Sequence, residues 1–117
     1  MQYTLLIYQS PQDFAERADP IKHQAFYASF MPYVQTLREA GIVVGSAGLE
    51  DPGAATTIRV RDGQRLVQDG PYADTKEQLG GLFIIDVPDL DTALQWAARC
   101  PTGNGTVLEV RPNLVFN

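Results

Sequence analysis

Side chains that can do chemistry gather in residues 69–81 (DGPYADTKEQLGG), between two segments rich in β-forming residues. Asp69 could act as a general base, Tyr72 could donate a hydrogen bond to a developing oxyanion, and Lys76 could hold an anionic group. The paired glycines at 80–81 would let a ligand approach the backbone closely, although they suit the start of a strand equally well. A connector that only reversed the chain could be much shorter. This stretch is therefore the first candidate for a binding or catalytic site.

The same stretch also has a purely conformational interpretation. Asp69 would cap a turn through its side-chain oxygen, Gly70 would take a backbone conformation that other residues resist, and Pro71 would fix the next φ angle. Asp74 and Glu77 would bracket one helical turn in the manner of a capping box. A sequence contains no distances between these groups, so both interpretations stay open. Under the functional one, Gly70 and Pro71 contact the ligand.

Two aromatic or titratable side chains outside this stretch are further candidates. Tyr8, at the end of the first expected strand, could line the same cleft as Tyr72 or lie at an interface. His23 is the single histidine and is a candidate catalytic residue. A lone histidine near a helix start is more often a surface or half-buried polar residue, because general-base work needs an orienting partner. Cys100 follows Arg99 at an expected helix C-terminus and is interpreted as packed and inert.

Length and composition exclude several classes of protein. A chain of 117 residues supports one domain, 1–117, with a modest core. The net charge of -5, with no cluster of Lys and Arg, argues against nucleic-acid binding. One cysteine and no signal peptide or membrane span predict a cytoplasmic protein. One His and one Cys are too few for the common zinc sites, and no nucleotide-binding loop is present, so we expect no metal and no cofactor.

The hydrophobic pattern predicts strands alternating with two main helices. An apolar run at 3–8 predicts a strand, and Ser10 with Pro11 predicts a short helical turn. The first long helix is expected from Asp19-Pro20 to Gly41, with a kink or break near residues 28–31 caused by Pro32. Asp62-Gly63 predicts a tight hairpin turn, and the alternation of apolar and basic residues before it predicts one buried and one solvated face. The other expected elements are strands at 42–49, 82–87 and 106–111 and a helix capped by Asp89.

This order predicts an α+β fold of the ferredoxin-like type. It has an antiparallel sheet, two main helices on one face, and a hairpin inserted between the second and third main strands. Leu5, Ile7, Ile84 and Val110 supply more apolar strand surface than two helices would cover. We therefore expect a homodimer in which two sheets pack face to face, as a dimeric α/β-barrel-like assembly. Such closure creates clefts in which ligands bind.

The chain resembles the YCII-related family, in its DGPF-type branch. The resemblance rests on Asp69-Gly70-Pro71-Tyr72, on the run from Thr75 to Gly81, and on residues 85–97. It extends over nearly the whole chain, with one departure: the final Phe of the signature is Tyr72 here, which keeps the ring and adds a hydroxyl. The resemblance implies a dimeric ferredoxin-like fold, a biochemical role that is largely unestablished, and an association with extracytoplasmic-function sigma factors.

The YciI-like branch of this family is proposed to carry a His-Asp pair with the histidine in the first helix. Counting back from the helix end at Gly41, the matching position falls close to Phe30, and His23 lies about two turns earlier. The pair is therefore not transferred to His23.

Three functions are compatible with these patterns, and the third, a purely structural role, explains least. The first is a small-molecule-binding protein, with enzymatic activity left open, that takes a small anionic or aromatic ligand in a cleft near Asp69, Tyr72 and Lys76. The second is a regulatory or adaptor homodimer without catalysis, linked to sigma-factor signalling. It would have these side chains used in turn hydrogen bonds and an apolar patch exposed elsewhere.

Overall fold

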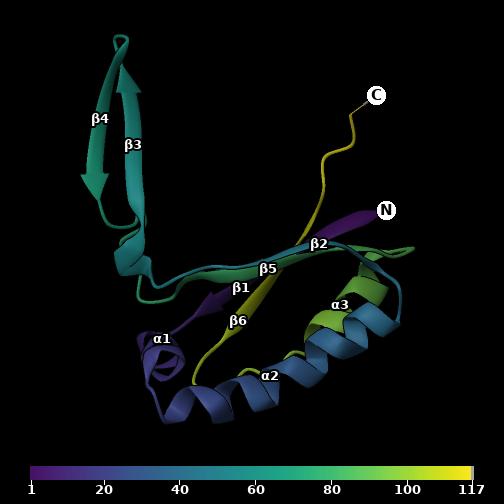
Figure 1. Ribbon diagram of the computed structural model, residues 1–117. Helices are drawn as coiled ribbons and strands as arrows, with labels where there is room; N and C mark the ends of the chain where they lie inside the picture. The colour runs from purple at the N-terminus through teal and green to yellow at the C-terminus, as the bar shows by residue number, and fades with distance from the viewer. Residues whose placement is uncertain (117) are drawn as a thin grey trace.

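The four-stranded sheet of the expected α+β fold is present in the computed structural model, which describes residues 1–116 (Figure 1). Its strand order is β2-β5-β1-β6, and every neighbouring pair is antiparallel. The strands are β1 (Gln2–Gln9), β2 (Val43–Gly48), β5 (Gln78–Asp86) and β6 (Val107–Pro112). β5 begins at Gln78, four residues before the expected strand, so it takes in the glycine pair. With β5 inserted between β1 and β2, the sheet has the ferredoxin-like order.

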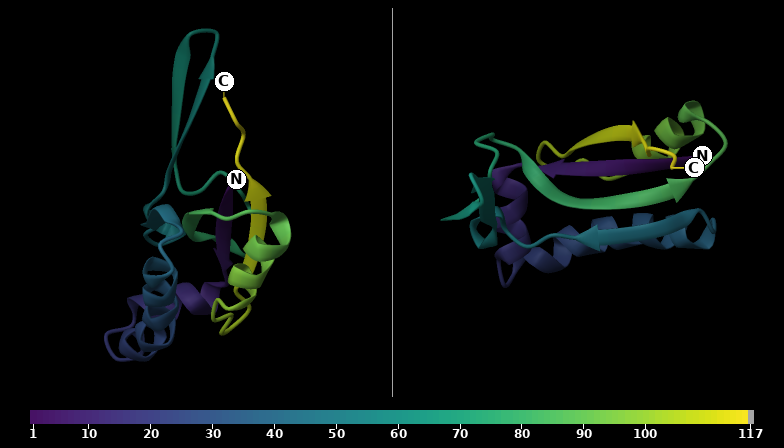
Figure 2. Two further views of the ribbon diagram at one scale, coloured as in Figure 1. Left: turned by 90° about the vertical axis from the view of Figure 1, so that its right-hand side faces the viewer. Right: turned by 90° about the horizontal axis from the view of Figure 1, so that it is seen from above.

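The helices lie on one side of this sheet (Figures 1 and 2). They are α1 (Pro11–Ala18), α2 (Lys22–Glu39) and α3 (Leu90–Ala98). Ser10 and Asp13 cap α1 reciprocally, and the Asp89 side chain caps α3 by accepting the amide of Thr92. Gly41, with φ of 71°, ends α2 where the sequence places its C-cap.

The expected break in α2 near residues 28–31 does not occur, because the chain stays helical through Pro32. Proline removes only one backbone hydrogen bond, and the turn that follows it is anchored to the core. Tyr33, Val34 and Leu37 are buried there, and the Thr36 hydroxyl donates to the carbonyl oxygen of Pro32 at 2.8 Å. Packing on the sheet therefore outweighs the local cost of the proline.

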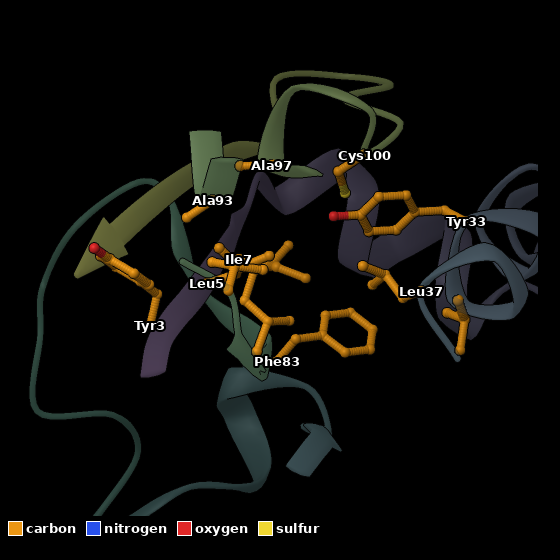
Figure 3. Packing of buried hydrophobic residues seen from close by; sticks show 12 residues of the cluster. Tyr3, Leu5, Ile7, Tyr33, Leu37, Phe83, Ala93, Ala97 and Cys100 are labelled. Atoms are coloured by element: carbon orange, nitrogen blue, oxygen red, sulfur yellow. The ribbon is translucent and has the colours of Figure 1, made fainter. Parts of the chain in front are cut away.

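The core lies between the sheet and the helices (Figure 3). Leu5 is fully buried and pairs with Phe83 on β5 and Val110 on β6. Ile7 and Val110 belong to the same packed layer. The expectation that Leu5, Ile7, Ile84 and Val110 are surplus apolar surface is therefore wrong for three of them. Only Ile84, which pairs with Thr4, points to the other face.

The sheet face opposite the helices is uncovered. Leu6 pairs with Leu82 and Thr4 with Ile84, and Tyr8 pairs with Val107. These side chains are half-buried, except Val107, which is 55% exposed. We call this surface the open face; its apolar and aromatic members are Leu6, Tyr8, Leu82, Ile84 and Val107. The prediction that one sheet face is not covered by helices thus holds, but apart from Ile84 the apolar residues on that face are not the ones expected.

The inserted hairpin is built as predicted but does not join the sheet. Its strands β3 (Thr56–Arg61) and β4 (Gln64–Asp69) pair only with each other and rise away from the body (Figure 1). Asp62 and Gly63, with φ of 52° and 77°, form the tight turn. The expectation of one buried hairpin face is wrong within a single chain, because the face that carries Ile58 and Val60 is open to solvent: these side chains are 55% and 70% exposed. We call residues 56–69 the arm.

The arm makes the molecule unusually extended. Its radius of gyration is 16.0 Å, against about 13 Å expected for a compact chain of this length. Within residues 1–116, no helix combines the length and apolarity needed to cross a membrane.

Candidate functional site

A cleft of about 540 Å³ opens at the base of the arm. It lies where the chain enters β3, leaves the arm and starts β5. One side is formed by the segment after β2, which includes a short 3-10 helix, η1 (Pro52–Ala54). The lining residues are Leu49, Glu50, Asp51, Pro52, Ala54, Ala55, Thr56, Thr57, Pro71, Tyr72, Gln78 and Leu79.

Two hydrogen bonds at the base of the arm join the segment that enters β3 to the segment that leaves β4, and these segments form two walls of the cleft. The amide of Gly70 donates to the carbonyl oxygen of Ala55 at 2.8 Å, and the hydroxyl of Thr57 donates to the carbonyl oxygen of Gly70 at 2.8 Å. Gly70 has a φ of 97°, a conformation that a side chain would strain. The signature glycine therefore has a conformational use, and that use positions Pro71 and Tyr72 in the cleft.

The third wall is tied to the sheet. The amide of Leu49 donates to the carbonyl oxygen of Gly80 at 2.9 Å, which holds the segment after β2 beside β5. Asp51 caps η1 by accepting the amide of Gly53 at 2.8 Å. Because each wall is fixed by backbone hydrogen bonds, the cleft has a defined shape at its base.

Arg17 fastens α1 to the same region. Its guanidinium donates to the Gln9 side-chain oxygen at 2.7 Å and to the carbonyl oxygen of Leu49, and it lies 5.1 Å from the centre of the Phe14 ring. Gln9 is 5% exposed, so its side-chain oxygen is buried, while Arg17 is half-buried. Sequence reasoning missed Arg17, because nothing in the local pattern indicates that α1 reaches the segment after β2.

Tyr72 presents its ring to the cleft from an exposed position. It is 73% exposed, and the Arg59 guanidinium lies 5.1 Å from the centre of its ring. A cation over an aromatic face is attracted by the ring's quadrupole, which favours this ring position over free rotation. The signature aromatic is therefore an exposed part of the cleft wall that Arg59 holds in position.

The connector between Tyr72 and β5 is organised by Gln78. Its side-chain amide donates to the carbonyl oxygens of Ala73 and Thr75, at 2.6 and 3.0 Å. The expected helical turn bracketed by Asp74 and Glu77 is absent, so that prediction is wrong. One side-chain amide reaches several connector carbonyls at once, which holds the segment in an irregular loop.

The glycine pair is explained by packing. A Cβ on Gly80 would stand 2.0 Å from Gln9 Oε1, and one on Gly81 would stand 3.0 Å from the carbonyl oxygen of Ala47. The atoms that approach the backbone closely at 80–81 thus belong to Gln9 and Ala47 of the protein.

Of the candidates named from the signature, Pro71 and Tyr72 line the cleft. Asp69, at the end of β4, and Lys76, in the connector, are exposed and lie outside its lining. Asp69 pairs in register with Thr56, so it belongs to the arm. The catalytic role of Asp69 and the ligand-binding role of Lys76 stay predictions.

Tyr8 and His23 lie on other surfaces. Tyr8 is on the open face of β1, paired with Leu79 and Val107. His23 is in the first turn of α2, where its Nδ1 lies 2.8 Å from the carbonyl oxygen of Asp19. Phe30, the position matched to the family's proposed histidine, packs against Phe83 with ring centres 6.5 Å apart. That position therefore contributes to the core rather than to acid-base chemistry.

Sequence reasoning missed most of the polar side chains of the cleft. Glu50 and Asp51, in the segment between β2 and β3, were not among its candidate residues. The threonines at 56 and 57 could have been found, because the Asp62-Gly63 turn predicts the hairpin register and hence which residues face the signature. Among the described residues that line the cleft there are two carboxylates and no Lys or Arg.

Two titratable groups with raised pKa values are buried. Burial raises the pKa of the Cys100 thiol to about 11, and burial also raises the pKa of the Tyr33 hydroxyl above its ordinary value. The Tyr33 hydroxyl donates to the carbonyl oxygen of Trp96 at 2.9 Å. Within residues 1–116, no group of three or more His, Cys, Asp or Glu side chains is placed to hold a metal ion.

Three comparisons with known proteins bear on this arrangement. The family model for the YCII-related domain matches residues 1–117. An uncharacterized protein of Rhizobium meliloti (strain 1021) is 43% identical over 80 residues, which are 67% of this chain and 64% of that protein. The match thus spans slightly less than two thirds of that relative.

A solved structure with a similar fold is 5-chloro-2-hydroxyhydroquinone dehydrochlorinase from Burkholderia phenoliruptrix, in complex with 2,5-dihydroxybenzoquinone. The TM-score is 0.50 and the sequence identity 15%, over 93% of this chain and 91% of that chain. At this identity the likeness concerns the fold alone.

Proposed function

The chain belongs to the YCII-related domain family, and from this premise we propose that it binds a small hydroxylated aromatic molecule in the cleft at the base of the arm. The observation that carries the proposal is the cleft itself, which the family's signature segment helps to line. Its volume of about 540 Å³ lies within the range of about 300–1,000 Å³ typical of small-molecule sites.

The chemistry of the lining selects the ligand class. Leu49, Pro52 and Leu79 offer apolar surface, and the Tyr72 ring offers a stacking partner. The carboxylates of Glu50 and Asp51 accept hydrogen bonds and repel anions. A neutral ring that bears hydroxyl donors, such as a phenol or hydroquinone, satisfies both requirements. An anionic ligand, also expected from the sequence, is less well matched, because no cation lies in the described lining.

The fold neighbour is consistent with this ligand class. That enzyme is named for its action on a chlorinated hydroxyhydroquinone, and its structure contains 2,5-dihydroxybenzoquinone. This supports a phenolic ligand by analogy of fold only. Acid-base chemistry on such a ring would need a proton acceptor and a donor, and Glu50 and the Tyr72 hydroxyl are the groups of the lining suited to those roles.

We also propose that the protein is a homodimer closed through the open face. Leu6, Tyr8, Leu82 and Ile84 form an apolar strip on the sheet face that no described helix covers, and such strips are normally buried. The alternative function, a regulatory or adaptor dimer, gains support from the exposed apolar surface. It gains none from the signature, because Asp69, Tyr72 and Lys76 are exposed rather than used in turn hydrogen bonds.

The proposal is tested by calorimetric titration with hydroquinone and catechol, with benzoate as the anionic comparison. Tyr72→Ala should weaken hydroquinone binding about ten-fold, since an aromatic contact contributes about 0.5–1.5 kcal/mol beyond its buried area. Glu50→Gln should weaken it several-fold. Glu39→Gln, at the exposed end of α2, is the control and should bind like the wild type. Binding that is indifferent to both cleft variants would place the ligand elsewhere.

A further inference from the structure

The two faces of the arm differ in chemistry. Ile58 lies opposite Val67, and Val60 lies opposite Arg65, so these four side chains share one face. Leu66 lies opposite Arg59 on the other face, together with Arg61. The arm therefore has an apolar face formed by Ile58, Val60 and Val67 and a predominantly polar face. All three apolar side chains are solvent-exposed, by 55%, 70% and 56% respectively.

An isolated hairpin of this kind needs a partner. Two strands without a third strand or a covering helix are marginally stable in water. Exposed β-branched residues on a free two-stranded ribbon also invite unwanted pairing. The regular alternation in β3, which predicts one buried face, is therefore explained if that face is buried against another surface.

The position of the arm indicates which surface this is. The arm and the C-terminal segment 113–116 both rise on the side of the sheet opposite the helices, at different ends of the open face (Figures 1 and 2). The C-terminal segment is also apolar and exposed, with Leu114, Val115 and Phe116 at 77%, 72% and 85%. The open face is thus flanked by two projecting apolar segments, and a body seated on that face would contact all three.

Charge favours a second copy of the chain as that body. The arm contains Arg59, Arg61 and Arg65 with Asp62 and Asp69, a net charge of +1, and the whole chain carries -5, so the remainder carries -6. An arm that carries positive charge is attracted to the acidic body of another copy. A two-fold arrangement also lets each copy provide the arm and receive it, so that both uncovered surfaces are buried at once.

We propose that the apolar face of the arm docks on a second copy of the chain, whose body is held between the arm and the C-terminal segment. This inference rests on the homodimer proposed above and adds that the arm contacts the partner copy. Because β3 begins with Thr56 and Thr57, which line the cleft, docking of the arm also holds one wall of the ligand site.

The test is the dimer dissociation constant of the full-length protein by analytical ultracentrifugation. The variant Ile58→Thr/Val60→Thr/Val67→Thr removes the apolar face and keeps β-branched residues, so the hairpin itself retains its strand preference. Leu66→Thr is the matched control, because Leu66 is 50% exposed on the opposite face. The triple variant should raise the dissociation constant at least ten-fold, and the control should stay within two-fold.

Hydrogen exchange of the wild type gives a second readout that needs no variant. Arm amides should be protected in the dimer and should lose protection on dilution below the dissociation constant. A dimer whose affinity is unchanged by the triple variant, or whose arm exchanges at the same rate at all concentrations, would overturn the docking and leave the sheet-to-sheet dimer standing. A wild type that stays monomeric would overturn both, while hydroquinone titration would still report on the cleft independently.

Discussion

The side-chain oxygen of Gln9 occupies the space that a side chain at residue 80 would need. A Cβ on Gly80 would stand 2.0 Å from Gln9 Oε1. The same oxygen accepts a hydrogen bond from the guanidinium of Arg17 at 2.7 Å. The glycine, the amide and the guanidinium therefore form one packed unit near the start of β5, next to Gln78 and Leu79, which line the cleft.

Gly80→Ala should destabilise the fold by about 1–3 kcal/mol, the usual cost of overpacking. Gln9→Ala removes the obstructing oxygen, so the double variant should be more stable than the sum of the single losses predicts. Gly81→Ala is the control, because its Cβ would meet the backbone oxygen of Ala47 at 3.0 Å, which Gln9→Ala does not move. Urea unfolding of the single and double variants gives the coupling free energy. Additive losses for Gly80 and Gln9 would contradict the direct contact.

Arg17→Met should lower the free energy of unfolding by about 1–3 kcal/mol, because it leaves the buried Gln9 oxygen without its donor. It should also weaken hydroquinone binding, since Leu49, whose carbonyl oxygen Arg17 holds, lines the cleft. Arg38→Met, at an exposed position in the last turn of α2, is the control and should leave both quantities nearly unchanged. Equal effects of the two variants would argue against a positioning role for Arg17.

Asp13→Ala should cost more than Asp89→Ala, although both residues cap helices. Asp13 is fully buried, and its carboxylate accepts the Thr106 hydroxyl at 2.7 Å, whereas Asp89 is exposed. We expect a loss of about 2–3 kcal/mol at Asp13, from the cap and the orphaned buried hydroxyl together. At Asp89 we expect about 1 kcal/mol, the loss of a cap alone. Thermal or urea unfolding compares the two directly, and similar losses would show that burial adds nothing to the cap.

Stability should fall at alkaline pH through Cys100. Its thiol has a pKa of about 11 in the folded chain against an ordinary value of 9.0, because burial disfavours the thiolate. The folded pKa is raised, so this contribution is fully present below pH 9.0 and is lost as pH rises through about 11. The stability difference between the wild type and Cys100→Ala should therefore change between pH 9.0 and about 11 to the disadvantage of the wild type. A difference independent of pH would show that the thiol titrates normally.

The same burial should make Cys100 slow to react with iodoacetamide in the native protein at pH 8, because the thiolate is the reactive form. The rate should rise sharply in urea. Mass spectrometry of the alkylated protein measures both rates, and an equal rate in the two conditions would contradict the buried environment of the thiol.

Local rules in the sequence determined the secondary structure and the element order. Ser10 with Asp13 and the Asp89 cap start helices, Gly41 ends one, and Asp62-Gly63 turns the hairpin. Each of these signals acts within a few residues, so it can be interpreted without knowing the fold. Where tertiary packing opposes a local rule, the packing prevails, as at Pro32, which stays inside α2 because the next turn is buried.

Only the tertiary structure decided where the candidate site lies. Glu50 and Tyr72 line one cleft because the Gly70 amide closes the neck of the arm on Ala55, and the Leu49 amide reaches β5. It also decided that Leu5 faces the helices while Ile84 does not, because strand register assigns each side chain to a face. The separation of the arm from the sheet depends on long-range pairing as well. These relations join residues far apart in the chain, and a residue pattern contains no distance between them.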